Sequence, residues 1–235
     1  MVYTIGNLHG CIDEWKEMLG KISFNNFDEI YVLGDVIDKG PEPIKLLFNM
    51  MLRSNVFVVL GNHEYAFLKC MKNVPFDATL EDFTQHLSEE NMNIFSEWIK
   101  SGGRVTFEQF MELSADDREA ILDYLEEFSP YDIINIDNKE FVLTHSGLKN
   151  FEPDKAFENY SIHDFIFNKP QHGQKFFENK TLICSASPTL KSDGSFSGRI
   201  HKEANFININ CGCIYSDNGG RLGCLRLDDM KEFYI

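Results

Sequence analysis

The fold of this chain is decided by Gly-Asn-Leu-His-Gly at residues 6–10, Gly-Asp-Val-Ile-Asp-Lys-Gly at 34–40 and Gly-Asn-His-Glu at 61–64. Each stretch follows a short apolar run, at residues 2–5, 30–33 and 56–60. Short apolar runs bounded by glycines predict buried strands, and the carboxyl ends of parallel strands meet at one edge of a sheet. We therefore expect the polar side chains behind these strands to converge at that edge.

Oxygen and imidazole donors dominate these strand ends: Asn7, His9, Asp35, Asp38, Asn62 and His63. Carboxylate, amide and imidazole groups are the ligands that hard and borderline divalent metals prefer. The pattern predicts a metal site at the carboxyl edge of the sheet.

Helical patterns follow the three motifs. Apolar residues recur at helical spacing from 12 to 22, Pro41 and Pro43 open a second helix, and a third is expected from about residue 63 to 71. Strand, polar motif and helix, repeated three times, indicate an α/β fold.

The middle of the chain has a different pattern. Residues 75–130 are expected to form a mostly helical insertion, in which Ser114 and Asp117 make a capping box for a helix that ends near Phe128. Strand patterns return at 131–136, 141–144, 182–184, 206–210 and 224–227. Two strand-rich halves covered by helices predict a four-layer α-β-β-α sandwich, with residues 1–235 as one domain.

Composition limits the classes of partner. Of 235 residues, 43% are hydrophobic and 25% charged, as in ordinary globular proteins, and the formal net charge is −15. A surface this acidic repels nucleic acid and anionic lipid, so we expect neither as a partner. The N-terminus shows no secretory signal pattern, and no apolar run approaches the length that spans a bilayer, so a cytoplasmic protein is expected.

The cysteines are not expected to form a disulfide framework in a chain of this length. Cys211 and Cys213 form a C-x-C pattern in the apolar stretch 207–214, where a strand would point both thiols to one face. No second cysteine pair lies nearby in sequence, so buried thiols are a better interpretation than a metal site.

Together with Thr144-His145-Ser146-Gly147, the three ordered motifs resemble those of calcineurin-like metallophosphoesterases, most closely the bacterial serine/threonine phosphatase branch. The Gly102-Gly103-Arg104-Val105-Thr106 segment resembles a Gly-Gly-x-x-Thr segment of that branch. The resemblance extends to the region around Pro188 and to residues 219–222, and thus covers nearly the whole chain. It implies the same four-layer sandwich and a two-metal site.

The resemblance also implies a ligand set. One metal would be held by Asn7, His9 and Asp35, and the second by Asp35, Asn62, His145 and one further histidine. Two of these positions depart from the family pattern. The family has aspartate where this chain has Asn7, and the expected Gly-His-Thr-Pro reads Ser-Ala-Ser-Pro at 185–188, which places Ala186 at the missing histidine.

These departures predict weak or single-metal occupancy, because Asp35 alone supplies a carboxylate and Asn7 offers only a neutral carbonyl oxygen. Manganese is the expected ion, with iron, zinc, magnesium and nickel as alternatives. Replacement of the missing ligand by His163, His172 or His201 stays open at this point, as does an engineered rather than a natural change at Asn7.

The resemblance implies in-line attack of a hydroxide on a phosphoester, with His63 protonating the leaving group and Asp38 fixing the tautomer of that ring. Lys39 and Lys169 lie at positions where the family carries phosphate-binding arginines, and they keep the charge but lose the bidentate fork. Asn210 likewise replaces a family acid.

Three functions therefore compete. The first is hydrolysis of phosphomonoesters, either small molecules or phosphorylated proteins, with weakened activity. The second is an inactive pseudophosphatase that binds a phosphorylated ligand or protein, motivated by Asn7 and Ala186. The third is symmetrical dinucleoside tetraphosphate hydrolysis, although those enzymes usually carry Gly-Asn-His-Asp where this chain has Glu64.

Overall fold

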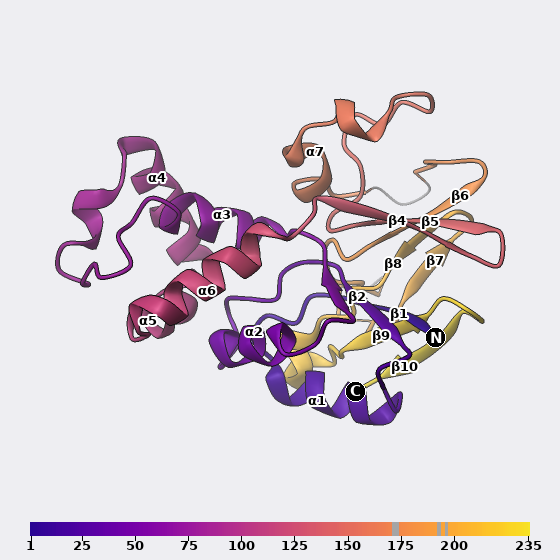
Figure 1. Cartoon of the computed structure of the whole chain (residues 1–235). Helices are drawn as coiled ribbons and strands as arrows, with labels where there is room; N and C mark the ends of the chain where they lie inside the picture. Colours follow the sequence, from indigo (N-terminus) through magenta and orange to yellow (C-terminus); the bar gives the residue numbers. More distant parts are fainter. Residues whose placement is uncertain (171–173, 192–193, 196) are drawn as a thin grey trace.

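Two five-stranded sheets form the centre of the protein (Figure 1). The computed structural model describes residues 1–170, 174–191, 194–195 and 197–235. The first sheet contains, from edge to edge, β10 (Lys231–Tyr234), β9 (Gly223–Arg226), β1 (Val2–Ile5), β2 (Glu29–Val32) and β3 (Val56–Val58). The second contains β4 (Tyr131–Ile136), β5 (Lys139–Thr144), β6 (Lys180–Cys184), β8 (Phe206–Asn208) and β7 (His201–Glu203).

Parallel pairing brings the sequence motifs together. β1 pairs with β2, and β2 with β3, in parallel, so the three motifs leave the first sheet at the same edge, as predicted. In the second sheet, β5, β6 and β8 are also parallel neighbours. A two-residue turn joins β4 to β5, and the positive φ angles of Asp137 (50°) and Asn138 (63°) are those of a type I′ hairpin.

Side-chain alternation along the strands creates the layers. In β2, Ile30 and Val32 belong to the core on the helix side, while Tyr31 on the opposite face belongs to the core between the sheets. In β5, Phe141 enters that same inter-sheet core, whereas Val142 packs into a third core beneath α7 (Ile162–Ile166). The predicted α/β sandwich is confirmed.

Helices cover both outer faces of this pair of sheets. α1 (Ile12–Lys21) and α2 (Pro43–Met51) lie against the first sheet, and α7 lies beside the second (Figure 1). The larger helical group contains α3 (Asn62–Met71), α4 (Glu89–Trp98), α5 (Arg104–Met111) and α6 (Ala115–Glu126). Short helical turns are η1 (Phe83–His86), η2 (Ile99–Gly103), η3 (Phe157–Asn159) and η4 (Cys213–Asn218).

Residues 83–126 fold almost entirely as helices and turns, and Ser114 caps α6 by accepting a 3.2 Å hydrogen bond from the backbone N–H of Asp117. The organisation as one domain with an insertion over about 75–130 stays a prediction. Among the described residues, no helix is both long enough and apolar enough to cross a bilayer.

The strand predicted at 206–210 is shorter in the structure, and the apolar stretch 207–214 does not continue as a strand. β8 ends at Asn208, Gly212 adopts a left-handed conformation with φ 83°, and η4 begins at Cys213. Cys211 consequently packs between the sheets, while Cys213 packs on the helix side of the first sheet, so the two thiols do not share a face. The prediction of buried thiols is confirmed, because all six cysteines are free and buried.

Candidate active site

A cleft of about 300 Å³ opens at the carboxyl ends of β1, β2, β3 and β5. Eight of the residues singled out from the sequence line it: Asn7, His9, Asp35, Lys39, Asn62, His63, His145 and Lys169. Asp38 lies behind this lining and is completely buried. The structure therefore brings all the predicted site residues to one place.

Four of these residues have a left-handed backbone: His9 (φ 45°), Asp35 (51°), Asp38 (72°) and Lys39 (62°). Such angles are unfavourable for residues with a Cβ, at a cost of about 1–3 kcal/mol each, and they persist only where surrounding contacts enforce them. Their concentration at the strand ends is typical of a functional site.

Glu64 supplies much of that enforcement. Its buried carboxylate accepts hydrogen bonds from the backbone N–H groups of Asp35 (2.9 Å), Val36 (2.7 Å) and Ile37 (3.1 Å), and from that of Gly61 (3.1 Å). Burial, reinforced by the charge of Asp35, raises the pKa of Glu64. Glu64 thus shapes the loop after β2 from behind, and it does not line the cleft in the described part of the chain.

Asp35, Asn62 and His145 form a compact donor set. His145 Nε2 lies 3.0 Å from Asn62 Oδ1 and 3.4 Å from Asp35 Oδ1. Its Nδ1 lies 2.8 Å from the carbonyl oxygen of Leu33, which can only accept, so Nδ1 carries the proton and Nε2 presents a lone pair. Three lone-pair atoms that face one another fit a divalent cation between them.

Asn7, His9 and Asp35 form a second group of potential metal ligands, whose atoms are engaged in hydrogen bonds. Asn7 Nδ2 donates a 2.9 Å hydrogen bond to Asp35 Oδ2, while Asn7 Oδ1 is buried and has no partner among the described residues. His9 Nδ1 lies 3.0 Å from the carbonyl oxygen of Ile37, which leaves Nε2 free to accept from Lys39 Nζ at 3.1 Å. This set holds less negative charge than an aspartate at position 7 would provide.

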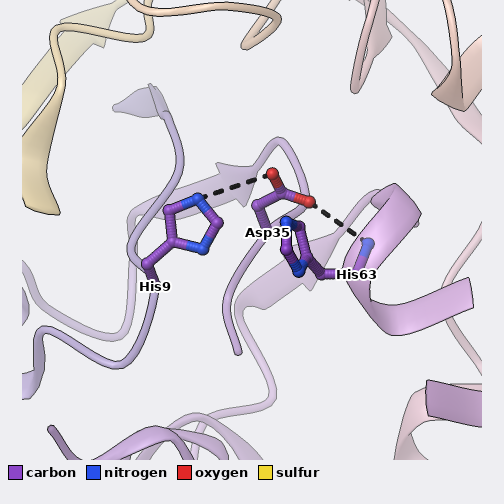
Figure 2. A group of neighbouring side chains, drawn as sticks. All are labelled: His9, Asp35 and His63. Carbon is purple, nitrogen blue, oxygen red and sulfur yellow. Dashed lines mark hydrogen bonds and ion pairs between the residues drawn. The ribbon is translucent and has the colours of Figure 1, made fainter. Parts of the chain in front are cut away.

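His9, Asp35 and His63 each offer a potential ligand atom, and these atoms lie within 4.8 Å of one another (Figure 2). Burial lowers the pKa of His9 to about 3, against the opposing effect of Asp35, so this ring is neutral and available as a ligand at physiological pH. Although burial alone would raise the pKa of Asp35, the neighbouring imidazoles, led by His145, hold it below its usual range. Of these three residues, the neutral ring of His9 and the carboxylate of Asp35 suit a cation.

Of the three histidines considered as replacements at position 186, the two that the structure describes lie elsewhere. Ala186 lines the cleft, whereas the exposed His163 contacts the hydroxyl of Tyr65 at 3.0 Å and His201 contacts Glu203 at 2.8 Å. Neither His163 nor His201 belongs to the cleft lining. His172, the third candidate, lies outside the described residues.

His63 and Asp38 form a close pair. His63 Nδ1 lies 2.6 Å from Asp38 Oδ2, and the other carboxylate oxygen accepts a 2.5 Å hydrogen bond from Thr106 Oγ1. Trp98 Nε1 donates to Asp38 Oδ2, also at 2.5 Å. Burial acts to lower the pKa of His63, but Asp35 and Asp38 outweigh it and hold the pKa above its ordinary value.

The remaining residues singled out from the sequence, two lysines and an asparagine, differ in how free their side chains are to contact a ligand. Lys39 and Lys169 are exposed residues of the cleft lining, where an ammonium group can reach a bound anion. Asn210 also lines the cleft, but its side chain is used structurally: Nδ2 donates to the carbonyl oxygen of Ala186 at 2.5 Å, and Oδ1 accepts from the N–H of Gly212 at 3.0 Å.

Sequence reasoning did not identify the contacts of Trp98, Thr106 and Glu64. The Gly-Gly-x-x-Thr segment was a visible signal for Thr106, but nothing in the local pattern indicated its partner. The Gly-Asn-His-Glu motif gives no indication of the partners of Glu64.

Comparison with known proteins supplies the family. A model of the calcineurin-like phosphoesterase family matches residues 2–207. A protein of Wigglesworthia glossinidia brevipalpis named symmetrical bis(5′-nucleosyl)-tetraphosphatase is 37% identical over 100 residues, which are 42% of this chain and only 37% of that relative. A protein of the same name from Nitrosospira multiformis aligns over 99% of this chain and 94% of its own length, at 24% identity.

Solved structures share the fold at low sequence identity. A crystal structure of a protein provisionally named diadenosine tetraphosphatase has a TM-score of 0.64 and 17% identity, and the match covers 100% of this chain and 92% of that one. A serine/threonine phosphatase from Saccharomyces cerevisiae has a TM-score of 0.59 and 13% identity, with coverage of 100% and 78%. The match to the family model over most of the sequence, in agreement with the fold, shows that this chain belongs to the calcineurin-like phosphoesterases, whose members use divalent metals.

Proposed function

We propose that this protein is a metal-dependent hydrolase of nucleotide phosphates, with bis(5′-nucleosyl) tetraphosphates as the first candidate substrate. The observation that carries the proposal is the His63–Asp38 pair, whose 2.6 Å contact faces a cleft that also holds Asp35, Asn62 and His145. A positioned acid next to a cation-binding donor set is the equipment of phosphoryl hydrolysis.

Each side chain has a part in the reaction. Water hydrolyses a P–O bond: its oxygen joins phosphorus while the bond from phosphorus to the leaving oxygen breaks, and His63 gives the proton of Nε2 to that oxygen. The water loses a proton to solvent, from which the His63 ring is protonated again. Asp38 accepts from Nδ1 of the same ring and so keeps Nε2 directed at the cleft. Lys39 and Lys169 supply positive charge for the phosphate chain. When bound, a divalent ion would activate water and neutralise phosphate oxygens.

The nucleotide substrate is favoured by the relatives, which are named symmetrical bis(5′-nucleosyl)-tetraphosphatases. In the sequence, Glu64 is an argument against this substrate, because such enzymes usually carry aspartate at that position. In the structure, the Glu64 carboxylate binds backbone N–H groups behind the cleft. The identity of residue 64 therefore bears on loop support and gives no argument against a dinucleoside substrate.

The donor set favours binding of one ion more than two. Asp35 is the single carboxylate among the described residues of the cleft lining, and the complete donor set is that of Asp35, Asn62 and His145. We expect manganese, with iron, zinc, magnesium and nickel as alternatives, because these oxygen and imidazole ligands suit all five.

The test is a product analysis. The purified protein, with excess manganese, is incubated with diadenosine tetraphosphate, p-nitrophenyl phosphate and a phosphoserine peptide, and products are separated by anion-exchange chromatography. Two ADP per tetraphosphate, formed only without chelator, support the proposal. Exclusive turnover of the peptide would replace it with the protein-phosphatase function.

A catalytically inactive phosphate-binding protein is the second candidate. Asn7 and Ala186 favour it, since both remove metal-binding groups from the cleft lining. This candidate predicts measurable affinity for the same phosphorylated ligands by calorimetry, little bound metal and no product. Metal-dependent turnover of any of the three substrates would exclude it.

A further inference from the structure

The region where α4 passes into α5 contacts the loop that carries Asp38. Trp98 at the end of α4 and Thr106 in α5 both donate to the Asp38 carboxylate, and Thr106 Oγ1 also accepts from the Asp38 backbone N–H at 2.9 Å. Next to it, the Lys39 N–H donates to the Gly102 carbonyl oxygen at 3.0 Å. The hydrogen bonds of Trp98 and Thr106 to Asp38 join residues that lie 60 and 68 positions apart in sequence. The reaction proposed above assigns no part to Trp98 or Thr106.

Two adjacent glycines make this approach possible. Gly102 has a φ of 113°, which breaks the helix inside η2, and a Cβ on it would collide with the Lys39 side chain. A Cβ on Gly103 would collide with the indole of Trp98. The break thus allows two consecutive helical segments to direct their donors at the same carboxylate.

The hydrogen-bond donors around Asp38 orient its carboxylate but leave its charge in place. An ionised carboxylate is an acceptor only, and Asp38 accepts from Trp98, Thr106 and His63 with none of its surface exposed. Trp98 and Thr106 are uncharged, so they fix the orientation of the carboxylate without neutralising it. The negative charge of Asp38 is left to act on His63.

We propose that Trp98 and Thr106 are positioning residues for proton donation: they hold Asp38 so that His63 keeps its proton on Nδ1 and directs Nε2 at the leaving oxygen. The proposal rests on the proposed hydrolytic function. Its consequence is that both residues determine how well the protein expels oxygen leaving groups that need a proton, and matter little for those that do not.

Thr106→Val tests this, since it keeps the shape of the side chain and removes the hydroxyl. We expect kcat on an alkyl phosphate to fall about tenfold or more, as part of the roughly 10²–10⁴-fold that a positioned acid contributes, and kcat on 2,4-dinitrophenyl phosphate to change less than about threefold. KM should stay unchanged, Thr106→Ser should restore the alkyl rate, and Trp98→Phe should reproduce the selective loss. An equal loss on both substrates, or no loss, would overturn the proposal.

Thr4→Val is the matched control. Thr4 in β1 is as completely buried as Thr106, and its hydroxyl bonds to none of the described residues, so both rates should stay at the wild-type level. Nitrogen-15 NMR of the His63 ring gives a readout that needs no turnover. The spectra are recorded at alkaline pH, where the ring is neutral and has a tautomer. The Nδ1–H tautomer in the wild type and a mixture of tautomers in Thr106→Val support the proposal even if hydrolysis itself fails, and an identical tautomer in both proteins contradicts it.

Discussion

The two sides of the cleft differ in completeness. After their proposed functions, we call the side that holds His63 and Asp38 the proton-donating side and the side that holds Asp35 the ion-binding side. Asp38 is buried and accepts from three donors. On the ion-binding side, Asn7 turns an amide N–H toward Asp35, and Ala186 contributes no ligand. The difference teaches that the carboxylate behind His63 is held at both oxygens, whereas the described cleft lining has Asp35 as its single carboxylate.

This contrast has a physical explanation. A neutral amide at position 7 fills the same space as a carboxylate, so the ion-binding side can lose charge without disturbing the packing. Asp38 has no such freedom, because removing it would leave three buried donors without an acceptor, at about 1–3 kcal/mol for each unsatisfied group. The proton-donating side therefore resists change more strongly than the ion-binding side.

The largest effect is expected from Asp35→Asn, which removes the carboxylate shared by both ion-binding sets. His145 Nε2 and His9 Nε2 lie 3.4 and 3.6 Å from the carboxylate oxygens of Asp35. An amide in place of that carboxylate would leave the two imidazoles without a negatively charged ligand to share a cation with. Metal affinity should fall more than about 100-fold, beyond the usual effect of indirect changes around a metal site. Elemental analysis after dialysis measures it. Asp123→Asn, an exposed change on α6, is the charge-matched control and should retain its metal.

An intermediate effect is expected when ligands are added. Ala186→His introduces an imidazole into the cleft next to the Asp35, Asn62 and His145 set, and Asn7→Asp introduces a second carboxylate. The double variant should bind manganese about 10–100-fold more tightly and hydrolyse substrate faster in proportion. Titration calorimetry and initial rates measure the two quantities. An unchanged affinity would mean that the ion-binding side is limited by its shape and not by its ligands.

The smallest effect is expected from Ser114→Ala in the helical group. This change removes the 3.2 Å cap of α6 and should lower the free energy of unfolding by about 1 kcal/mol, as measured by urea denaturation. Because Ser114 is not part of the cleft lining, kcat should stay constant. A large loss of kcat would show that the helical group couples to the cleft more widely than through Trp98 and Thr106.

Local patterns in the sequence predict the sandwich and the convergence of the polar residues that follow β1, β2 and β3. The apolar runs that become β1, β2 and β3, and the polar residues directly after them, are properties of short segments and need no knowledge of distant contacts. β7 and β10 were missed because His-Lys-Glu and Lys-Glu-Phe-Tyr are polar edge sequences whose pairing depends on their neighbours.

The support behind the site could not be read in the same way. Trp98 and Thr106 lie on opposite sides of the helix break at Gly102, and both contact Asp38 in a loop distant in sequence. Periodic patterns of apolar residues do not indicate contacts of this kind. The same holds for Glu64, because the Gly-Asn-His-Glu motif does not indicate the four backbone N–H groups from which its carboxylate accepts hydrogen bonds.

The most direct test of a working proton-donating side is the rate of His63→Ala relative to wild type with saturating manganese. The account predicts that kcat on an alkyl phosphate falls by about 10²–10⁴-fold, while kcat on 2,4-dinitrophenyl phosphate, which leaves without a proton, falls far less. A His63→Ala protein that hydrolyses the alkyl phosphate as fast as the wild type would contradict it.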